Sequence, residues 1–118
     1  METAETTDIR QPGRARALLS NKDFDLTFDA WKRDFDVQLR WISRTGELND
    51  VFVLEKSTDG LVFQPMKTLD GKGAAGDNLY FEEFDAQPVR GDNFYRLLNV
   101  RRDGTSEYSP VRRVHFGN

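Results

Sequence analysis

The stretch Asp50-Val51-Phe52-Val53-Leu54-Glu55-Lys56-Ser57-Thr58-Asp59-Gly60 combines a strand signal with a turn signal. Phe52 and Leu54 are two residues apart, a spacing typical of a β-strand that buries one face and exposes the other. Asp59-Gly60 is a common turn dipeptide, because glycine adopts positive φ and aspartate hydrogen-bonds the local backbone. The stretch therefore predicts a strand that ends near Ser57, followed by a tight turn into the next strand.

Period-two apolar spacing continues on both sides of this stretch. The strand after the turn is expected to start near Val62, with Phe63 facing inward and Pro65 marking a sheet edge. Five further strands are expected, at residues 24–29, 37–41, 79–84, 94–100 and 107–116. No window after residue 23 shows a period of 3.6 residues, and turn signals such as Asp103-Gly104 recur at intervals typical of antiparallel sheets. The sequence predicts an all-β fold, a seven-stranded antiparallel sandwich of immunoglobulin or fibronectin type III-like type.

The N-terminal residues differ from the rest in composition. Residues 1–23 mix Thr, Glu, Arg, Gln, Pro and Gly, and only Ile9, Leu18 and Leu19 are large apolar side chains. So little apolar surface does not offset the entropy of ordering the segment. We expect a mobile arm or linker at 1–23 and one sandwich domain at 24–118, which suits a chain of 118 residues.

The composition excludes several classes of partner and of binding site. The chain has no cysteine, so disulfides and thiolate metal sites are excluded. Seventeen basic and 20 acidic residues give a formal net charge of -3, which provides no broad positive field for nucleic acid. The sequence contains no run of 18 apolar residues, and its first residues, 1–8, are acidic and lack the apolar core of a leader. We expect neither nucleic-acid binding nor direct membrane insertion.

Two motifs carry a family resemblance. Residues 50–60 together with Phe63 are similar to the pattern F-x-V-E-(R/K)-S-x-D-G-x-x-F. Residues 94–100, with Asp103-Gly104 and Tyr108-Ser109, are similar to Y-Y-R-L-x-x-V-x-x-D-G-x-x-x-Y-S. Both patterns resemble a fibronectin type III-like family of secreted and surface proteins from bacteria that use the type IX secretion route. The resemblance spans roughly residues 37–116 and implies an extracellular or cell-surface location, with the periplasm as a further option.

The resemblance also places large side chains in the core. Trp41 and Tyr95 lie where such modules bury their central aromatic residues, and the Tyr95 hydroxyl then needs a hydrogen-bond partner. Glu55 and Arg96 are expected to face outward on neighbouring strands. A cross-strand ion pair between them would contribute about 0.2 to 1 kcal/mol at an exposed site.

One tripeptide and one glycine-rich run resemble known binding motifs. Arg90-Gly91-Asp92 is the sequence that integrins recognise on an exposed loop, but Gly91 is explained by the turn that leads into the strand at Phe94. The run Gly71 to Gly76 lacks the order and the Ser or Thr of a phosphate-binding P-loop. We interpret both as turns or flexible loops, without a cofactor.

Metal binding and catalysis also lack their usual components. A set of acidic and amide residues lacks the ligand spacing of a calcium loop: Asp70, Asp77, Asn78, Glu82, Glu83 and Asp85. His115 is the only histidine, and no serine lies in a G-x-S-x-G motif. We therefore expect no catalytic, cofactor-binding or metal-binding residues and no enzyme activity.

The sequence leaves three functions open. The first is a non-catalytic structural or protein-interaction module of a secreted or cell-surface protein, which contacts other domains of its chain or of an envelope or secretion assembly. The second is a small accessory subunit of the type IX secretion or gliding machinery. The third is a carbohydrate-binding module that uses exposed aromatic residues such as Trp31. Two arginine pairs, Arg101-Arg102 and Arg112-Arg113, are together a candidate contact for an acidic partner.

Overall fold

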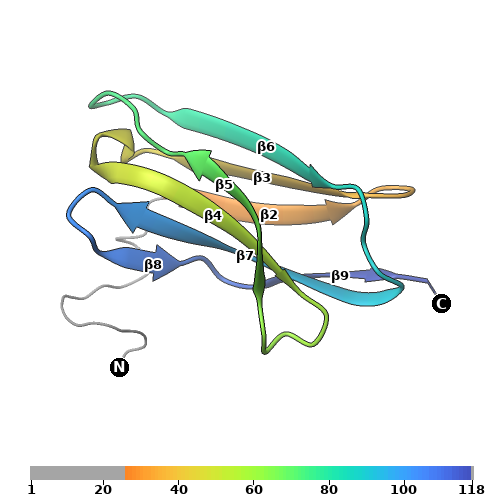
Figure 1. Ribbon diagram of the computed structural model, residues 1–118. Helices are drawn as coiled ribbons and strands as arrows, with labels where there is room; N and C mark the ends of the chain where they lie inside the picture. Colours follow the sequence, from red (N-terminus) through yellow and green to blue (C-terminus); the bar gives the residue numbers. More distant parts are fainter. Residues whose placement is uncertain (1–25, 118) are drawn as a thin grey trace.

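The computed structural model describes residues 26–117 (Figure 1). These residues form eight strands and one short 3₁₀ turn, η2 (Gly46–Leu48): β2 (Leu26–Lys32), β3 (Val37–Ser43), β4 (Asn49–Ser57), β5 (Gln64–Asp70), β6 (Leu79–Asp85), β7 (Gly91–Arg101), β8 (Ser106–Tyr108) and β9 (Arg112–Phe116). Within this range no helix is long and apolar enough to cross a membrane. The arm expected at residues 1–23 lies outside the described residues.

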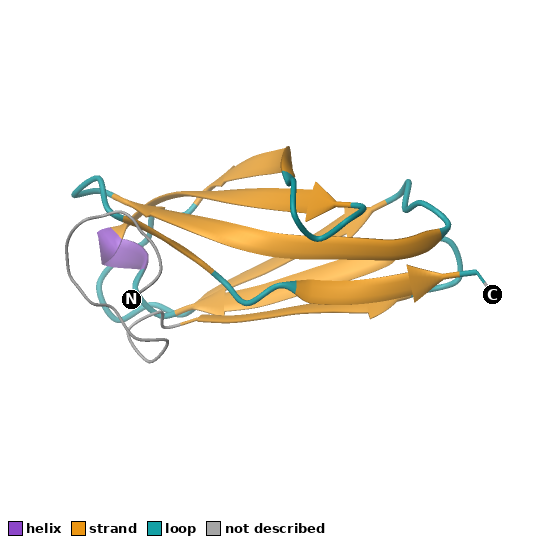
Figure 2. Ribbon diagram, turned by 90° about the horizontal axis from the view of Figure 1, so that it is seen from below, coloured by secondary structure: helices purple, strands orange, loops and turns teal. Residues whose placement is uncertain are grey.

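The strands form two antiparallel sheets that pack face to face, as Figures 1 and 2 show. The first sheet has the order β2-β3-β6. The second has the order β5-β4-β7-β8, and β9 pairs with β7 as well. Each neighbouring pair is antiparallel. The prediction of an all-β fold with antiparallel sheets is confirmed.

The predicted strand number is wrong, because the expected strand at 107–116 is two strands. β8 ends at Tyr108 and β9 begins at Arg112, and both pair with β7. Pro110 lies between them, and proline has no N–H to donate to a ladder. Ser109 spans part of the break: its backbone N–H donates to the Leu97 carbonyl at 2.8 Å, and its Oγ accepts from the Leu97 N–H at 2.8 Å.

The core lies between the sheets and is centred on Trp41. Buried apolar side chains come from both sheets: Phe28, Val37, Leu39, Trp41, Phe52, Leu54, Tyr95, Leu97 and Val114. The Trp41 ring stacks on Phe81 at a centroid distance of 5.2 Å and meets Phe52 edge-on at 5.9 Å. Such aromatic contacts add stability beyond the burial of area. The prediction that Trp41 and Tyr95 occupy the core is confirmed.

A buried polar network joins the two sheets at one point. Asp85 at the end of β6 accepts a hydrogen bond from the Tyr95 hydroxyl at 2.7 Å and from Lys56 Nζ at 2.8 Å. Burial would raise the pKa of the Asp85 carboxyl, but hydrogen bonds from Lys56, Tyr95 and the Gln87 N–H outweigh it, so this pKa lies below its usual range. Burial, and then the bond to Asp85, raise the pKa of Tyr95, which keeps its hydroxyl protonated as the donor.

The turns follow the sequence signals, with one exception. Gly60 and Gly104 have φ of 77° and 89°. The Asp59 carboxylate accepts from the Leu61 N–H at 2.8 Å, so the predicted turn is present. The prediction that Phe63 faces inward is wrong, because β5 begins only at Gln64 and the Phe63 ring packs on Arg96 at the outside of the second sheet.

Candidate functional site

The outer face of the three-stranded sheet is a grid of alternating side chains, which we call the aromatic face. The strand register places three rows side by side across β2, β3 and β6. The rows are Thr27, Ile42 and Tyr80; Asp29, Arg40 and Glu82; and Trp31, Gln38 and Phe84. Their neighbours along the strands, such as Phe28, Leu39 and Trp41, point into the core. These nine positions therefore face solvent together.

Three aromatic rings of this face are open to solvent. Tyr80 is 71% exposed, Trp31 is 43% exposed and Phe84 is 42% exposed. The Arg40 guanidinium lies 5.3 Å from the Trp31 ring centroid, and the Arg33 guanidinium lies 5.0 Å from that of Phe84. These cation–π contacts favour one orientation of the Trp31 and Phe84 rings.

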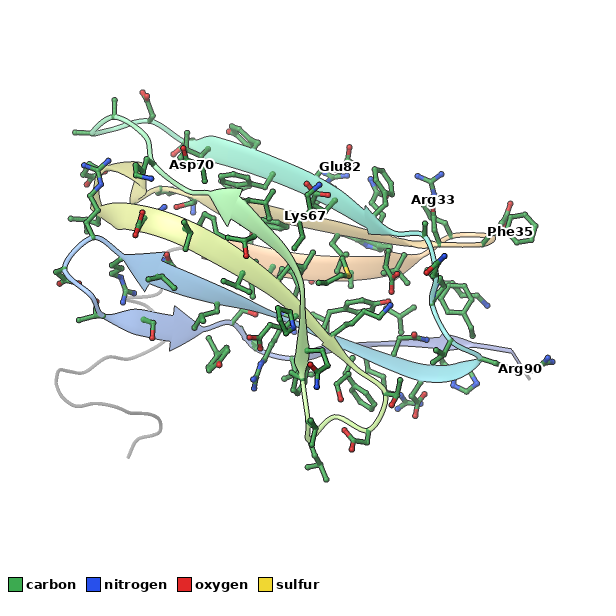
Figure 3. All side chains as sticks on the ribbon, viewed as in Figure 1. Arg33, Phe35, Lys67, Asp70, Glu82 and Arg90 are labelled. Atoms are coloured by element: carbon green, nitrogen blue, oxygen red, sulfur yellow. The ribbon has the colours of Figure 1, made fainter. Side chains whose placement is uncertain are left out.

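The middle row, which consists of Asp29, Arg40 and Glu82, lies between the two rows that carry the rings. The Gln38 side-chain amide donates to the Glu82 carboxylate. Asp29 lies 3.5 Å from the Arg112 guanidinium of β9. Part of the face forms a depression of about 460 Å³ lined by residues of all three strands. Figure 3 shows Glu82 on β6 pointing away from the second sheet. The face combines ring surfaces with hydrogen-bonding groups on one side of the three-stranded sheet.

The outer face of the second sheet has a different composition, and we call its centre the apolar face. Phe52 and Leu54 of β4 point into the core, so Val51 and Val53 point outward, and both are partly exposed. Leu98 and Val100 of β7 are their direct partners and are also partly exposed. Antiparallel sheets with one wet face carry polar outer residues, whereas strands covered on both faces are apolar throughout. The centre of β4 and β7 resembles the second kind.

One border of the apolar face is a stacked arginine. The Arg96 guanidinium lies 4.0 Å from the Phe63 ring centroid and 3.9 Å from that of Tyr108, and its Nε donates to Glu55 at 2.7 Å. The predicted ion pair between Glu55 and Arg96 is confirmed. The two aromatic partners were not predicted, because the pairing of β7 with β8 and the outward turn of Phe63 are tertiary features.

The tripeptide Arg90-Gly91-Asp92 lies at the start of β7. Gly91 has φ of 95°, which fits the predicted turn. Asp92 pairs with His115 of β9, with 2.8 Å between Oδ1 and Nδ1, and accepts from Arg113 Nε at 3.0 Å. Hydrogen bonds from His115, and then from Arg113, lower the pKa of the Asp92 carboxyl. The carboxylate that an integrin would need is thus occupied within a strand pair.

The glycine-rich run belongs to the loop between β5 and β6. The N–H groups of Gly71 and Gly73 donate to the backbone carbonyls of Asp50 and Gly46 at 2.9 and 3.0 Å. Lys72 Nζ lies 3.1 Å from the Asp50 carboxylate. Two amides and the lysine that a phosphate would use therefore already have partners.

The structure separates the acidic residues that the sequence analysis considered together. Glu82 faces outward on the aromatic face, whereas Glu83 pairs with Lys67 at 2.9 Å and Asp85 belongs to the buried network. Asp70 pairs with Lys72 at the other end of the sandwich from Arg33 and Phe35, as Figure 3 shows. Among residues 26–117 no group of three or more His, Asp or Glu side chains is arranged to hold a metal ion.

The basic pairs do not form one patch. Arg112 opposes Tyr95 on β7, whereas Arg101 is the last residue of that strand, about 20 Å away along an extended chain. Each arginine has its own partner: Arg101 binds Glu107, Arg102 the Asn49 carbonyl, Arg112 the Phe28 carbonyl and Arg113 Asp92. The candidate contact for an acidic partner is therefore not assembled.

Sequence reasoning identified Trp31 but missed the other members of the aromatic face. Tyr80 and Phe84 are spaced four residues apart in one strand, which indicates that they share a face. The sequence does not state which strands are neighbours or which of their faces is outward. Only the pairing of β3 with both β2 and β6 brings the three rings onto one surface.

No protein-family model matches this sequence, and no curated protein matches it. Among solved structures, the fold is similar to part of pectate lyase Pel3 from Pectobacterium carotovorum in two crystal structures, with TM-scores of 0.62 and 0.59 and sequence identities of 14% and 16%. Each match covers 80% of this chain and 27% of that enzyme's chain. At such low identity the likeness concerns the fold alone, and this chain corresponds to about a quarter of the enzyme's length.

Proposed function

We propose that this chain is a non-catalytic, fibronectin type III-like module of a secreted or cell-surface protein associated with type IX secretion, and that it binds another protein domain through its apolar face. The observation that carries the proposal is the outward set Val51, Val53, Leu98 and Val100 at the centre of the second sheet. Apolar residues on both sides of a strand are stabilised when a further layer covers them.

The strand order supports the fibronectin type III-like interpretation. In an immunoglobulin constant-type sandwich the fourth strand belongs to the sheet of the first strand. Here β5 pairs with β4 in the other sheet. The Tyr95 hydroxyl bonds back to the Asp85 carboxylate, ten residues upstream; the tyrosine corner of such sandwiches also bonds back along the chain, but to the backbone. The resemblance of residues 50–60 and 94–109 points to the same family.

The side of the sandwich that carries the apolar face is the larger of the two. β4 has nine residues and the sheet has four strand positions, so this side measures about 19 Å by 30 Å at ordinary strand spacings, and the apolar face lies on its two middle strands. Leu61, 84% exposed, and Val62 lie on the loop after β4, beyond the Glu55–Arg96 pair that borders the apolar face. The combination of an apolar centre with Tyr108 and Arg96 at the border is typical of protein interfaces.

The fold match supports the interpretation as a module. The matched region is only 27% of the chain of pectate lyase Pel3, so the same fold occurs there as one part of a longer protein. A module of this kind would contact other domains of its own chain. A small accessory subunit of the secretion or gliding machinery is the alternative, and in that case the apolar face would contact a separate subunit.

The test is recovery of a partner from the native cell envelope by the immobilised protein. Wild type is compared with Val53→Lys, which places a charge at the centre of the apolar face, and with Thr27→Lys, a matched control on the opposite face. We expect one protein to be recovered by wild type and by Thr27→Lys but not by Val53→Lys. Equal recovery by all three, while thermal melting shows that each is folded, would contradict the proposal.

A further inference from the structure

The aromatic face lies on the opposite sheet from the apolar face, and its chemistry points to another kind of ligand. Its outer rows carry the exposed rings of Trp31, Phe84 and Tyr80, and its middle row carries Asp29, Arg40 and Glu82. Rows four residues apart in a strand are about 14 Å apart. A ligand that contacts both ring rows must therefore be extended and must offer apolar surfaces separated by polar groups.

A second copy of this chain, related by a twofold axis through the middle row, would place like charges opposite each other. A twofold axis parallel to the strands would place Asp29 opposite Glu82 of the second copy, and an axis across the strands would place Asp29 opposite Asp29. Both arrangements place Arg40 opposite Arg40. Like charges directly opposite each other are destabilising, so the middle row disfavours self-association through this face.

The face is also the smaller of the two. Three strands of seven residues give a surface of about 14 Å by 24 Å at ordinary spacings. That is roughly 340 Å², compared with roughly 570 Å² for the side of the sandwich that carries the apolar face at the same spacings. A narrow, linear ligand makes better use of such a strip than a globular surface does.

The charge of the aromatic face indicates which class of linear ligand it can bind. The middle row carries two carboxylates, those of Asp29 and Glu82, and one guanidinium, that of Arg40. The Arg112 guanidinium of β9 pairs with Asp29 and balances its negative charge. Arg33, beside Phe84, is paired with Asp36 at 3.0 Å. The face thus carries no excess positive charge that would attract an acidic polymer or nucleic acid.

We propose that the aromatic face binds an uncharged polysaccharide. The apolar faces of its sugar rings stack on Trp31 and Tyr80, whose flat rings present apolar area at little entropic cost. Hydroxyl groups between them exchange hydrogen bonds with the Asp29 and Glu82 carboxylates and the Arg40 guanidinium. Carboxylates accept and guanidinium donates, so the row serves both roles of a hydroxyl group. This site is independent of the protein interface proposed above.

The test is native gel electrophoresis with a polysaccharide cast into the gel. The probes are three uncharged polymers, hydroxyethylcellulose, glucomannan and mixed-linkage β-glucan, and one acidic polymer, polygalacturonate. We expect at least one uncharged polymer to slow the wild-type protein. Tyr80→Ala and Trp31→Ala should each raise the apparent Kd at least about tenfold, the effect of losing roughly 1.4 kcal/mol of contact. Tyr108→Ala, on the opposite sheet, should migrate like wild type.

Thermal melting distinguishes a loss of binding from a loss of folding. Tyr80 is largely exposed, so its replacement should change the melting temperature by only a few degrees. The proposal is overturned if none of the uncharged polymers slows the wild type, or if polygalacturonate alone does. Unchanged migration of folded Tyr80→Ala and Trp31→Ala would also overturn it. The Val53→Lys variant, which tests the protein interface, should bind the polysaccharide normally, so the two proposals fail separately.

Discussion

The outer faces of the two sheets are built by the same alternation and carry different chemistry. On β3 the outward residues are Gln38, Arg40 and Ile42, flanked by exposed rings, whereas on β4 they include Val51 and Val53, flanked by Leu98 and Val100. The first face is wet and offers hydrogen bonds between rings, and the second is apolar at its centre. The inward residues of both sheets serve one core, so the outer residues are free to differ. One small sandwich thus presents two outer faces of different chemistry.

The largest expected effect tests which side of β3 faces inward. Trp41→Ala should lower the free energy of unfolding by about 3 to 5 kcal/mol, because it removes buried area and leaves a cavity among Phe28, Phe52 and Phe81. Urea denaturation measures this loss. Its neighbour Arg40, replaced by Ala, is the control and should cost less than about 1 kcal/mol. Similar losses for the two variants would mean that the register of β3 is wrong.

The second effect concerns the polar network that holds the two sheets together. Asp85→Asn should cost about 1 to 3 kcal/mol at pH 7, since the amide replaces a carboxylate that accepts bonds from Lys56 and Tyr95. The folded pKa of Asp85 is lowered, so its contribution is present above the unfolded pKa, near 3.9, and is lost as pH falls through the folded value. The difference between wild type and variant should therefore shrink below about pH 4. A difference that stays constant from pH 7 to pH 3 would contradict the network.

A third experiment asks whether the N-terminal residues cover either face. The composition of residues 1–23 offers little to bury, so deletion of residues 1–20 should shift the melting temperature by only a few degrees. Differential scanning calorimetry measures the shift. A much lower melting temperature, or insolubility that Val53→Lys relieves, would show that these residues cover the apolar face.

The smallest expected effect sharpens the assignment of the apolar face. Val53→Thr keeps the β-branched shape and adds a hydroxyl, which reaches water if position 53 faces outward. The free energy of unfolding should then change by less than about 0.5 kcal/mol. The same substitution in a core would bury the hydroxyl at a cost of about 1 to 3 kcal/mol. Chemical denaturation distinguishes the two values, and the larger one would place Val53 inside.

The fold follows largely from local sequence signals. Period-two spacing located β3, β4, β6 and β7, and Asp59-Gly60 and Asp103-Gly104 located two turns. Pro110 interrupts the last strand, and a single proline in a strand signal indicates either an edge or a break, so the count of seven was wrong by one. Phe63 faces outward because the turn continues to residue 63, and element boundaries depend on such tertiary detail.

The candidate surfaces were less accessible to sequence reasoning. Trp31 stood out as a single aromatic residue, but its relation to Tyr80 depends on β3 pairing with strands that lie far apart in sequence. The apolar face depends in the same way on the pairing of β4 with β7. Periodicity gives the side of a strand on which a residue lies, and only the sheet order gives its neighbours.

Oxidative footprinting of the wild-type protein tests the difference between the two faces most directly. Hydroxyl radicals label exposed aromatic side chains, so Trp31 and Tyr80 report on the aromatic face, and Tyr108 reports on the border of the apolar face. With saturating uncharged polysaccharide, we predict that labelling of Trp31 and Tyr80 falls while labelling of Tyr108 is unchanged. Equal protection of all three residues, or protection of Tyr108 alone, would contradict the assignment of the two faces to two kinds of ligand.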